Sequence, residues 1–572
     1  MNQNAKNIEI VVKLLKENNI RRIVISPGGT NIPLVKAIQK DDHFICYSVV
    51  DERSAIYFAI GLYLQTGEII ATSCTSAQAT RNYIPGLTEA FYKRVPIIAI
   101  TMSKHPRFTY QEYMQAPDQA SLPNDCVKKS FVLPFITDEH DIYHSIRVSN
   151  EAICEVSRNG FGPVQLCIPW LDFAINNKMP TIRNISIYKL DDEWNVDVQN
   201  KKIMLAIGEH RPFTKEEKDC IERFCQKYNV MVYTNHLSNY CGKYSINGNF
   251  LLSTLSLEEF RKKLLPDIFI SIGGQTGDYP LYKLISLPEL DHIEHWRVSE
   301  DGQLIDTYDK LTKVFQCSES SFFNKFNDEN VEDHSYFDKW MSINNNINTQ
   351  LQLPFSNVAI AQYLSKKLPK NSVVQFSILN SLRVWELFDL DSSINCFSNV
   401  GAFGIDGGLS TLIGHSFATD EKCFMIIGDL AFFYDMNSIG IRGIKDNVRI
   451  LLVNNNGGIE FKLGGKTDES VDEYIAAANH FKNAKGWSET CGFKYLSASN
   501  MDEFIKYSDE FVEDALQPIL FEVFVSDIDE SQAYLSLIDA NKEKTIKDHI
   551  KSNIKNMLGQ DTVTKIKKLR DK

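Results

Sequence analysis

Short apolar runs that end in glycine- or asparagine-rich turns recur along the chain and alternate with segments of helical periodicity. The first part contains "RRIVISPGG", "HFICYSVV", "EIIATSCTS" and "VPIIAITMS", with "SAIYFAIGLYLQTG" as a helix between two of them. The middle part contains "KKIMLAIGEH", "YNVMVYTN" and "PDIFISIGG", and the last part "SVVQFSILNS", "CFSNVGAFGIDGG", "KCFMIIGD" and "VRILLVNNNGG". Strands that alternate with helices predict an α/β protein of three stacked domains with parallel sheets.

Three domains also follow from the length, because 572 residues are too many for one hydrophobic core. We predict domains at 1–180, 181–345 and 346–540. Residues 541–572 differ, since they carry ten Lys and Arg against four Asp and Glu. In this tail Ile546, Ile550, Ile554 and Leu558 recur at every fourth position and predict a basic helix with one apolar stripe. The stripe packs on the body or on a neighbouring subunit, or the helix binds an acidic partner or a membrane surface.

Composition narrows the class of protein. The chain is 43% hydrophobic and 23% charged, as in globular proteins, and its net charge of −12 argues against a nucleic-acid-binding surface. The longest apolar runs are shorter than the about 18 residues of a transmembrane helix. Twelve scattered cysteines without a CxxC pair are typical of reduced core thiols in a cytoplasmic enzyme, and no zinc site is expected.

Polar residues follow two apolar runs of the last block. Asp429 follows "FMII" and Asn455 follows "ILLV". Because ligands bind at the carboxyl ends of parallel strands, we expect both side chains at one edge of the sheet. A carboxylate, an amide oxygen and a free carbonyl in the glycine turn suit Mg²⁺ that holds a diphosphate. The backbone amides of Leu430 and Ala431 would face the phosphate oxygens.

This spacing, Gly-Asp and then a strand that ends in Asn-Asn-x-Gly, resembles the binding signature of thiamine-diphosphate enzymes. Such an enzyme needs a carboxylate on the pyrimidine nitrogen N1′, which helps the cofactor lose its C2 proton. Glu52, in "SVVDERSAIYFAIGL", lies at a strand-to-helix junction and is the predicted catalytic residue. Without the second signature, a glutamate in a first helical turn would only favour the helix dipole.

Longer matches narrow the resemblance to one branch. "ISPGGTNIPL", "DERSAIYFAIGL", "CTSAQATRNYIPGLTEAFYKRVPIIAIT", "SNVGAFGIDGGLST" and "GDLAFFYDMN" resemble the 2-succinyl-5-enolpyruvyl-6-hydroxy-3-cyclohexene-1-carboxylate synthases of the menaquinone pathway. The middle block matches in outline only. The resemblance implies pyrimidine-binding, central and diphosphate-binding domains. It also implies a homodimer or homotetramer in which Glu52 and the metal site come from different subunits.

The resemblance also assigns roles to single residues. Glu52 would contact N1′, Gln115 would face the reacting carbon, and Ile405 would bend the cofactor. Asp429, Asn455 and the carbonyl of Gly457 would bind Mg²⁺. Further cofactor contacts would come from Ser381, Gly428, Leu430 and Ala431.

Several cationic residues of the branch are replaced, and these changes bear on the substrate. The branch uses arginine to hold substrate carboxylates in bidentate pairs. Losing such anchors forfeits roughly 1.5–3 kcal/mol each, so we expect a rebuilt pocket and disfavour the menaquinone reaction. Arg383 is able to compensate for one loss. The replacements are Thr30 in "SPGGT", Val400 in "SNVGAFGID", Trp385 in "NSLRVW" and the pair Asp278-Tyr279.

The new side chains suit a less charged or hydroxyl-rich acceptor such as a sugar, although Trp385 and Tyr279 are equally consistent with packing. Gln78, in "CTSAQAT", is a further candidate for the pocket. Glu460, in "NNNGGIEF", lies where thiamine decarboxylases carry an acid that handles protons. A solvated surface glutamate is an equally good interpretation of Glu460.

The sequence therefore predicts a thiamine-diphosphate- and Mg²⁺-dependent enzyme that decarboxylates a 2-oxo acid and transfers the resulting carbanion to an acceptor. Three alternatives stay open. They are simple decarboxylation, the menaquinone-pathway reaction itself and, least favoured, a non-catalytic protein of this fold. The donor and the acceptor are not identified by sequence.

Overall fold

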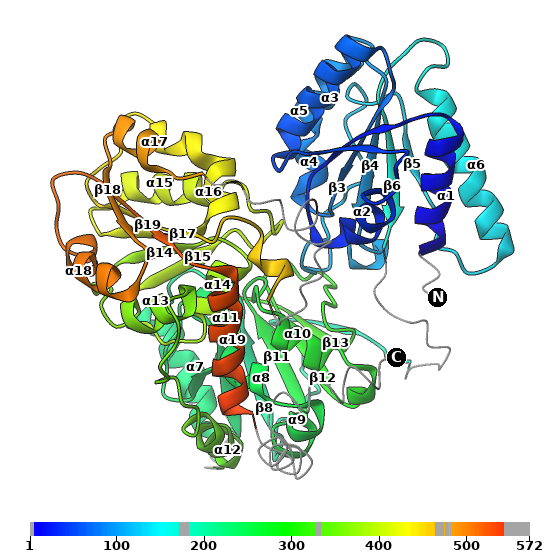
Figure 1. Ribbon diagram of the computed structural model, residues 1–572. Coiled ribbons are helices and arrows are strands. Elements are labelled where there is room, and N and C mark those ends of the chain that lie inside the picture. Colours follow the sequence, from blue (N-terminus) through cyan, green and yellow to red (C-terminus); the bar gives the residue numbers. More distant parts are fainter. Residues whose placement is uncertain are drawn as a thin grey trace, which may run out of the picture.

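The computed structural model describes residues 5–170, 182–326, 333–463, 474, 480 and 482–542. It contains three parallel sheets, each with its own helices, as the alternating pattern predicts (Figure 1). The predicted domain limits at 180, 345 and 540 stay predictions, and residues 543–572 of the basic tail lie outside the described residues. No helix of the described part is long and apolar enough to cross a membrane.

The first sheet has the strand order β2-β1-β3-β4-β6-β5. Helices cover both of its faces, and each face has a separate apolar core, so the strands β1, β3, β4 and β6 are largely buried on both sides. Its strands are β1 (Arg22–Ile25), β2 (Ile45–Ser48), β3 (Ile70–Cys74), β4 (Ile97–Ser103), β5 (Ser130–Val132) and β6 (Val164–Pro169). Its helices are α1 (Ala5–Glu17), α2 (Ile32–Ile38), α3 (Glu52–Thr66), α4 (Gln78–Asn82), α5 (Ile84–Tyr92) and α6 (Glu139–Glu155).

The central sheet has the order β10-β9-β8-β11-β12-β13-β7 around one large core. Its strands are β7 (Ser186–Lys189), β8 (Ile203–Ile207), β9 (Val230–Thr234), β10 (Ser245–Asn247), β11 (Ile268–Ile272), β12 (Glu294–Val298) and β13 (Leu311–Gln316). Its helices are α7 (Lys215–Lys227), α8 (Gly248–Thr254), α9 (Leu257–Lys263), α10 (Tyr279–Ile285), α11 (Glu319–Asn324) and α12 (Ser335–Asn344).

The third sheet has the order β15-β14-β16-β17-β19-β18 and again two cores, one on each face. Its strands are β14 (Val373–Phe376), β15 (Asn395–Ser398), β16 (Cys423–Gly428), β17 (Val448–Asn454), β18 (Lys494–Ala498) and β19 (Ile519–Phe524). Its helices are α13 (Asn357–Leu364), α14 (Asn380–Trp385), α15 (Gly408–Ala418), α16 (Asp429–Asp435), α17 (Lys485–Thr490), α18 (Met501–Val512) and α19 (Asp527–Asn541).

The first and third sheets share one topology, because the order of β1 to β6 repeats in β14 to β19. In both sheets the chain runs first to one side of the starting strand and then to the other. This reversal leaves a crevice at the carboxyl ends of β1 and β3, and another at those of β14 and β16, where ligands of such sheets bind. The strand order therefore fixes where the site lies.

Candidate active site

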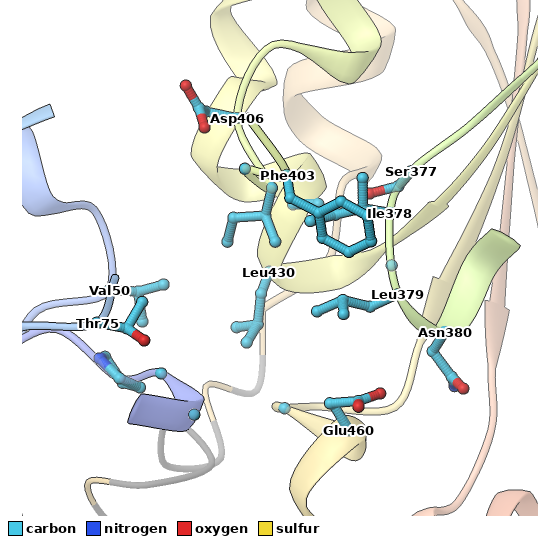
Figure 2. A pocket seen from close by; sticks show the side chains of 18 of the residues that line it. Val50, Thr75, Ser377, Ile378, Leu379, Asn380, Phe403, Asp406, Leu430 and Glu460 are labelled. Atoms are coloured by element: carbon cyan, nitrogen blue, oxygen red, sulfur yellow. The ribbon is translucent and has the colours of Figure 1, made fainter. Parts of the chain in front are cut away.

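The two crevices face each other and together form one cleft, which is lined by residues of the first and third domains. It has a volume of about 190 Å³. In Figure 2, Val50 and Thr75 approach from the first domain, while Leu379, Phe403 and Leu430 form the opposite side. The structure brings most of the predicted residues to this cleft: Glu52, Gln78, Gln115, Ser381, Ile405, Gly428, Asp429, Leu430, Ala431, Asn455, Gly457 and Glu460.

Both walls of the cleft come from the same chain. The Tyr434 hydroxyl, on α16, donates to Glu52 Oε2 at 2.7 Å and accepts from Asn82 Nδ2 at 2.7 Å. These two bonds join the first domain to the third. The expected division of Glu52 and the metal residues between different subunits, like the oligomeric state, stays a prediction.

Local sequence places Glu52 at the cleft. Asp51 caps α3 by accepting from the Ser54 amide at 3.2 Å, which fixes the first turn and points Glu52 towards the third domain. The Glu52 side chain is buried. Burial raises the pKa of its carboxyl to about 7, and the Tyr434 hydrogen bond acts in the opposite direction. A carboxyl poised near neutral pH suits proton transfer.

The raised pKa predicts a pH-dependent stability. A carboxyl whose pKa rises from 4.5 to about 7 on folding contributes stability below pH 4.5 that is lost as the pH rises through 7. We expect cofactor-free Glu52→Gln protein to exceed the wild type in free energy of unfolding by about 3 kcal/mol at pH 8, and by less than about 1 kcal/mol at pH 5. Urea unfolding at both pH values measures this difference. The exposed Glu9→Gln serves as the control, and an equal difference at both pH values would contradict the assignment.

The three asparagines at the end of β17 have separate roles. Asn454 is buried and donates to Glu522 Oε1 at 2.7 Å, so it anchors the strand. Asn456 adopts a left-handed conformation (φ 67°), which asparagine tolerates and which turns the chain. Asn455 lines the cleft, and its Oδ1 is buried without a hydrogen-bond partner among the described residues. This unpaired oxygen is free for a ligand.

Asp429 begins α16 and lines the same cleft as Asn455. Its Oδ2 accepts from the Gly457 amide at 3.1 Å and lies 3.2 Å from His480 Nε2. No cluster of three or more His, Cys, Asp or Glu that would hold a metal occurs in the part of the chain that the structure describes. One carboxylate and one unpaired amide oxygen fit Mg²⁺ that takes its remaining ligands from a diphosphate and water. The sequence analysis did not predict His480.

Three predicted substrate residues, Thr30, Trp385 and Val400, do not line the cleft in this structure, and their role in substrate binding stays a prediction. The Thr30 hydroxyl is 2.8 Å from Thr75 Oγ1 and accepts from the Ser76 amide at 2.9 Å. Trp385 and Val400 are fully buried in the core of the third domain. Burying an apolar side chain or a hydrogen-bonded hydroxyl costs less free energy than burying an arginine. These replacements therefore point into the interior of the protein.

Two of these side chains, Thr30 and Trp385, still support residues that line the cleft. Thr30 holds the turn that carries Thr75, and Gly28 permits the contact because a Cβ there would lie 2.3 Å from Thr75 Cβ. Trp385 Nε1 donates to Asn357 Oδ1 at 3.2 Å, and Asn357 lines the cleft. Their influence on a ligand is therefore indirect.

Backbone strain also gathers at the cleft. Ala77, Gln115, Leu379 and Phe403 line it with φ of 76°, 60°, 64° and 60°. Each such non-glycine conformation costs on the order of 1–3 kcal/mol and is typical of functional sites. The sequence gives no sign of these four conformations.

Glu460 has a partner that sequence analysis did not assign to it. Arg383 Nη1 donates to Glu460 Oε2 at 2.8 Å, and both side chains are half-buried. Glu460 is therefore neither a freely solvated glutamate nor an isolated buried acid. Sequence analysis also missed Asn82 and Tyr434. Asn82 lies four residues after Gln78 on α4, so helical spacing was a usable signal for it.

Comparisons with known proteins agree with this geometry. The family model "Thiamine pyrophosphate enzyme, N-terminal TPP binding domain" matches residues 6–122. The chain is similar to the 2-succinyl-5-enolpyruvyl-6-hydroxy-3-cyclohexene-1-carboxylate synthase of Phocaeicola vulgatus, at 34% identity over 92% of this chain and 96% of that protein. It is also similar to the synthases of the same name from Bacteroides thetaiotaomicron (31%; 92% and 96%) and Bacteroides fragilis (31%; 92% and 97%). The chain therefore belongs to the thiamine-diphosphate enzymes, in the branch that contains these synthases.

Proposed function

We propose that this thiamine-diphosphate enzyme uses Mg²⁺ to decarboxylate a 2-oxo acid and joins the remaining carbon unit to an acceptor other than isochorismate. The observation that carries the proposal is that Glu52 faces Asp429 and Asn455 across one cleft. The Glu52 carboxyl, whose pKa is raised by burial, thus lies opposite the oxygen donors of Asp429 and Asn455. When bound, thiamine diphosphate accepts the electron pair that is left as carbon dioxide leaves.

Each wall has its own task in this proposal. The Asp429 carboxylate and Asn455 Oδ1 would hold Mg²⁺ and, through it, the diphosphate. Glu52 would hydrogen-bond the pyrimidine ring, while Tyr434 keeps its carboxyl in place. Ile405 lies on the third-domain side, where an apolar side chain would support the cofactor.

The cleft lining favours transfer to an acceptor over simple protonation. Leu379, Phe403, Ile405, Leu430 and Ile459 all line it. These apolar side chains exclude water from the reacting carbon, which would otherwise take a proton from solvent. Gln78 and Gln115 supply neutral hydrogen-bonding groups at the same place.

The acceptor differs from isochorismate in this proposal because the cleft presents no cation. Neither Lys nor Arg lines it among the described residues. Arginine forks are the usual partners of carboxylates, so a dicarboxylic pair of substrates lacks anchors here. The name of the relatives refers to their own reaction.

A product assay tests the proposal. Purified protein with thiamine diphosphate and Mg²⁺ is given a panel of 2-oxo acids, with and without candidate carbonyl acceptors. We expect carbon dioxide release, and a product larger than the aldehyde only when an acceptor is present. The aldehyde alone would favour simple decarboxylation. Efficient use of 2-oxoglutarate with isochorismate would overturn the choice of acceptor, and no carbon dioxide from any oxo acid would overturn the whole proposal.

A further inference from the structure

A second cavity opens beside the cleft. It has a volume of about 630 Å³ and shares Leu379, Phe403 and Glu460 with the cleft. Its walls come from α8, α10, α14 and α19, so it lies between the central and third domains. A molecule that reacts in the cleft is able to extend into this side cavity past Glu460, which Figure 2 shows at the edge of the cleft.

Arg383 lines the side cavity and contacts Glu460 at this boundary. Its Nη1 donates to Glu460 Oε2 at 2.8 Å, and its guanidinium carbon lies 5.4 Å from the centre of the Tyr279 ring. The other lysine or arginine of the cavity is Lys283, which is exposed and lies over the same ring at 5.6 Å. The ring face of Tyr279 and the carboxylate of Glu460 hold Arg383 in position at the entrance, which is the place where the side cavity meets the cleft.

The other carboxyl groups of the side cavity are engaged elsewhere. Asp278 is buried and accepts from the Tyr233 hydroxyl at 3.1 Å and the Leu281 amide at 3.2 Å. Glu386 is buried and accepts from Asn249. Glu460 is therefore the carboxylate that neutralises Arg383 where the cavity meets the cleft.

This pairing changes what the entrance accepts. An unpaired arginine beside a reaction centre would bind a substrate carboxylate in a charge-assisted hydrogen bond. Here the carboxylate of Glu460 already takes that bond, and a second carboxylate would be repelled by it. The hydroxyls of Tyr279 and Tyr534 line the same cavity and have no hydrogen-bond partner among the described residues, so they are able to bind an uncharged polar group.

We propose that Glu460 is a specificity-determining residue which blocks Arg383 from within the protein, so that the side cavity takes the uncharged, hydroxyl-bearing end of the acceptor and rejects a carboxylate. This inference rests on the proposed function, because it takes the cleft as the place of reaction. It gives Glu460 a role that needs no proton transfer.

Ligand binding tests the proposal without any turnover. Butyrate and butyramide have nearly the same shape and differ in charge, so titrations of both by ligand-detected NMR isolate the carboxylate. With wild-type full-length protein, loaded with thiamine diphosphate and Mg²⁺, we expect butyrate to bind no more tightly than butyramide. In Glu460→Gln, which keeps the shape but removes the charge, butyrate should bind about tenfold more tightly while butyramide is unchanged.

The double variant Arg383→Gln/Glu460→Gln is the matched control. It should lose the gain in butyrate affinity that Glu460→Gln shows. Lys283→Gln in the Glu460→Gln background should keep it, since Lys283 is not paired with Glu460. A gain that survives the loss of Arg383 would overturn the proposal. The same holds for equal butyrate affinity in the wild type and Glu460→Gln, once thermal unfolding and the second variant Glu460→Ala show that the fold is intact. Absence of carbon dioxide release would overturn the proposed function and leave this binding result standing.

Discussion

Replacing Glu52 with glutamine is expected to slow exchange of the C2 proton of bound thiamine diphosphate by about a hundredfold or more. Glutamine keeps the shape and accepts the Tyr434 hydrogen bond, which is 2.7 Å long in the wild type. It has no titrating proton to share with the pyrimidine ring. The fold and the affinity for the cofactor should change little, because the diphosphate is held on the opposite wall.

Deuterium exchange at C2, followed by rapid acid quench and NMR, measures this rate directly. Asp406→Asn is the matched control, because Asp406 also lines the cleft with a carboxyl whose pKa is raised by burial. This control should slow exchange far less than Glu52→Gln. Unchanged exchange in Glu52→Gln would remove Glu52 from the catalytic role. No exchange in the wild type would favour a non-catalytic protein.

Replacing Asp429 with asparagine is expected to lower the Mg²⁺-dependent affinity for thiamine diphosphate by about ten- to a hundredfold, the value of one charge-assisted contact. The variant keeps an oxygen beside Asn455 Oδ1 but removes the carboxylate in the described donor set. A metal that bridges protein and diphosphate depends on that charge. Calorimetric titration of thiamine diphosphate, with Mg²⁺ and with a chelator, measures the loss.

Asp435→Asn is the control for this experiment. Asp435 ends the same helix, and its carboxylate accepts from the Ser410 amide at 2.8 Å, away from the cleft. Equal affinity in Asp429→Asn and the wild type would contradict the metal assignment. So would a wild-type affinity that does not respond to the chelator.

Apolar runs predicted the strands of the site correctly. Each run named at the outset overlaps a strand of the structure, and these strands are β1 to β4, β8, β9, β11 and β14 to β17. Shorter or more mixed strands such as β5 and β10, with three residues each, escaped because so short a segment has no readable period. The repeated strand order of the first and third sheets was not visible either, since topology depends on long-range pairing.

Residues at strand ends were also predictable, because the chain direction in a parallel sheet places them at the ligand-binding edge. This applies to Glu52, Asp429 and Asn455. For residues within a helix, the sequence did not predict which side chains face the cavity and which face the core. On α14, Arg383 and Trp385 are two residues apart, which is about 200° around the helix axis. One of them reaches the side cavity and the other is buried in the core.

By itself the sequence determined the fold class and the strand-end residues of the cleft, because these depend on local periodicity. Its resemblance to a known binding signature indicated the cofactor family. The tertiary structure alone decided that Tyr434 contacts Glu52 and that Glu460 neutralises Arg383. These contacts join residues 382 and 77 positions apart. No local pattern encodes such pairs, since they depend on how packed sheets and helices bring distant segments together.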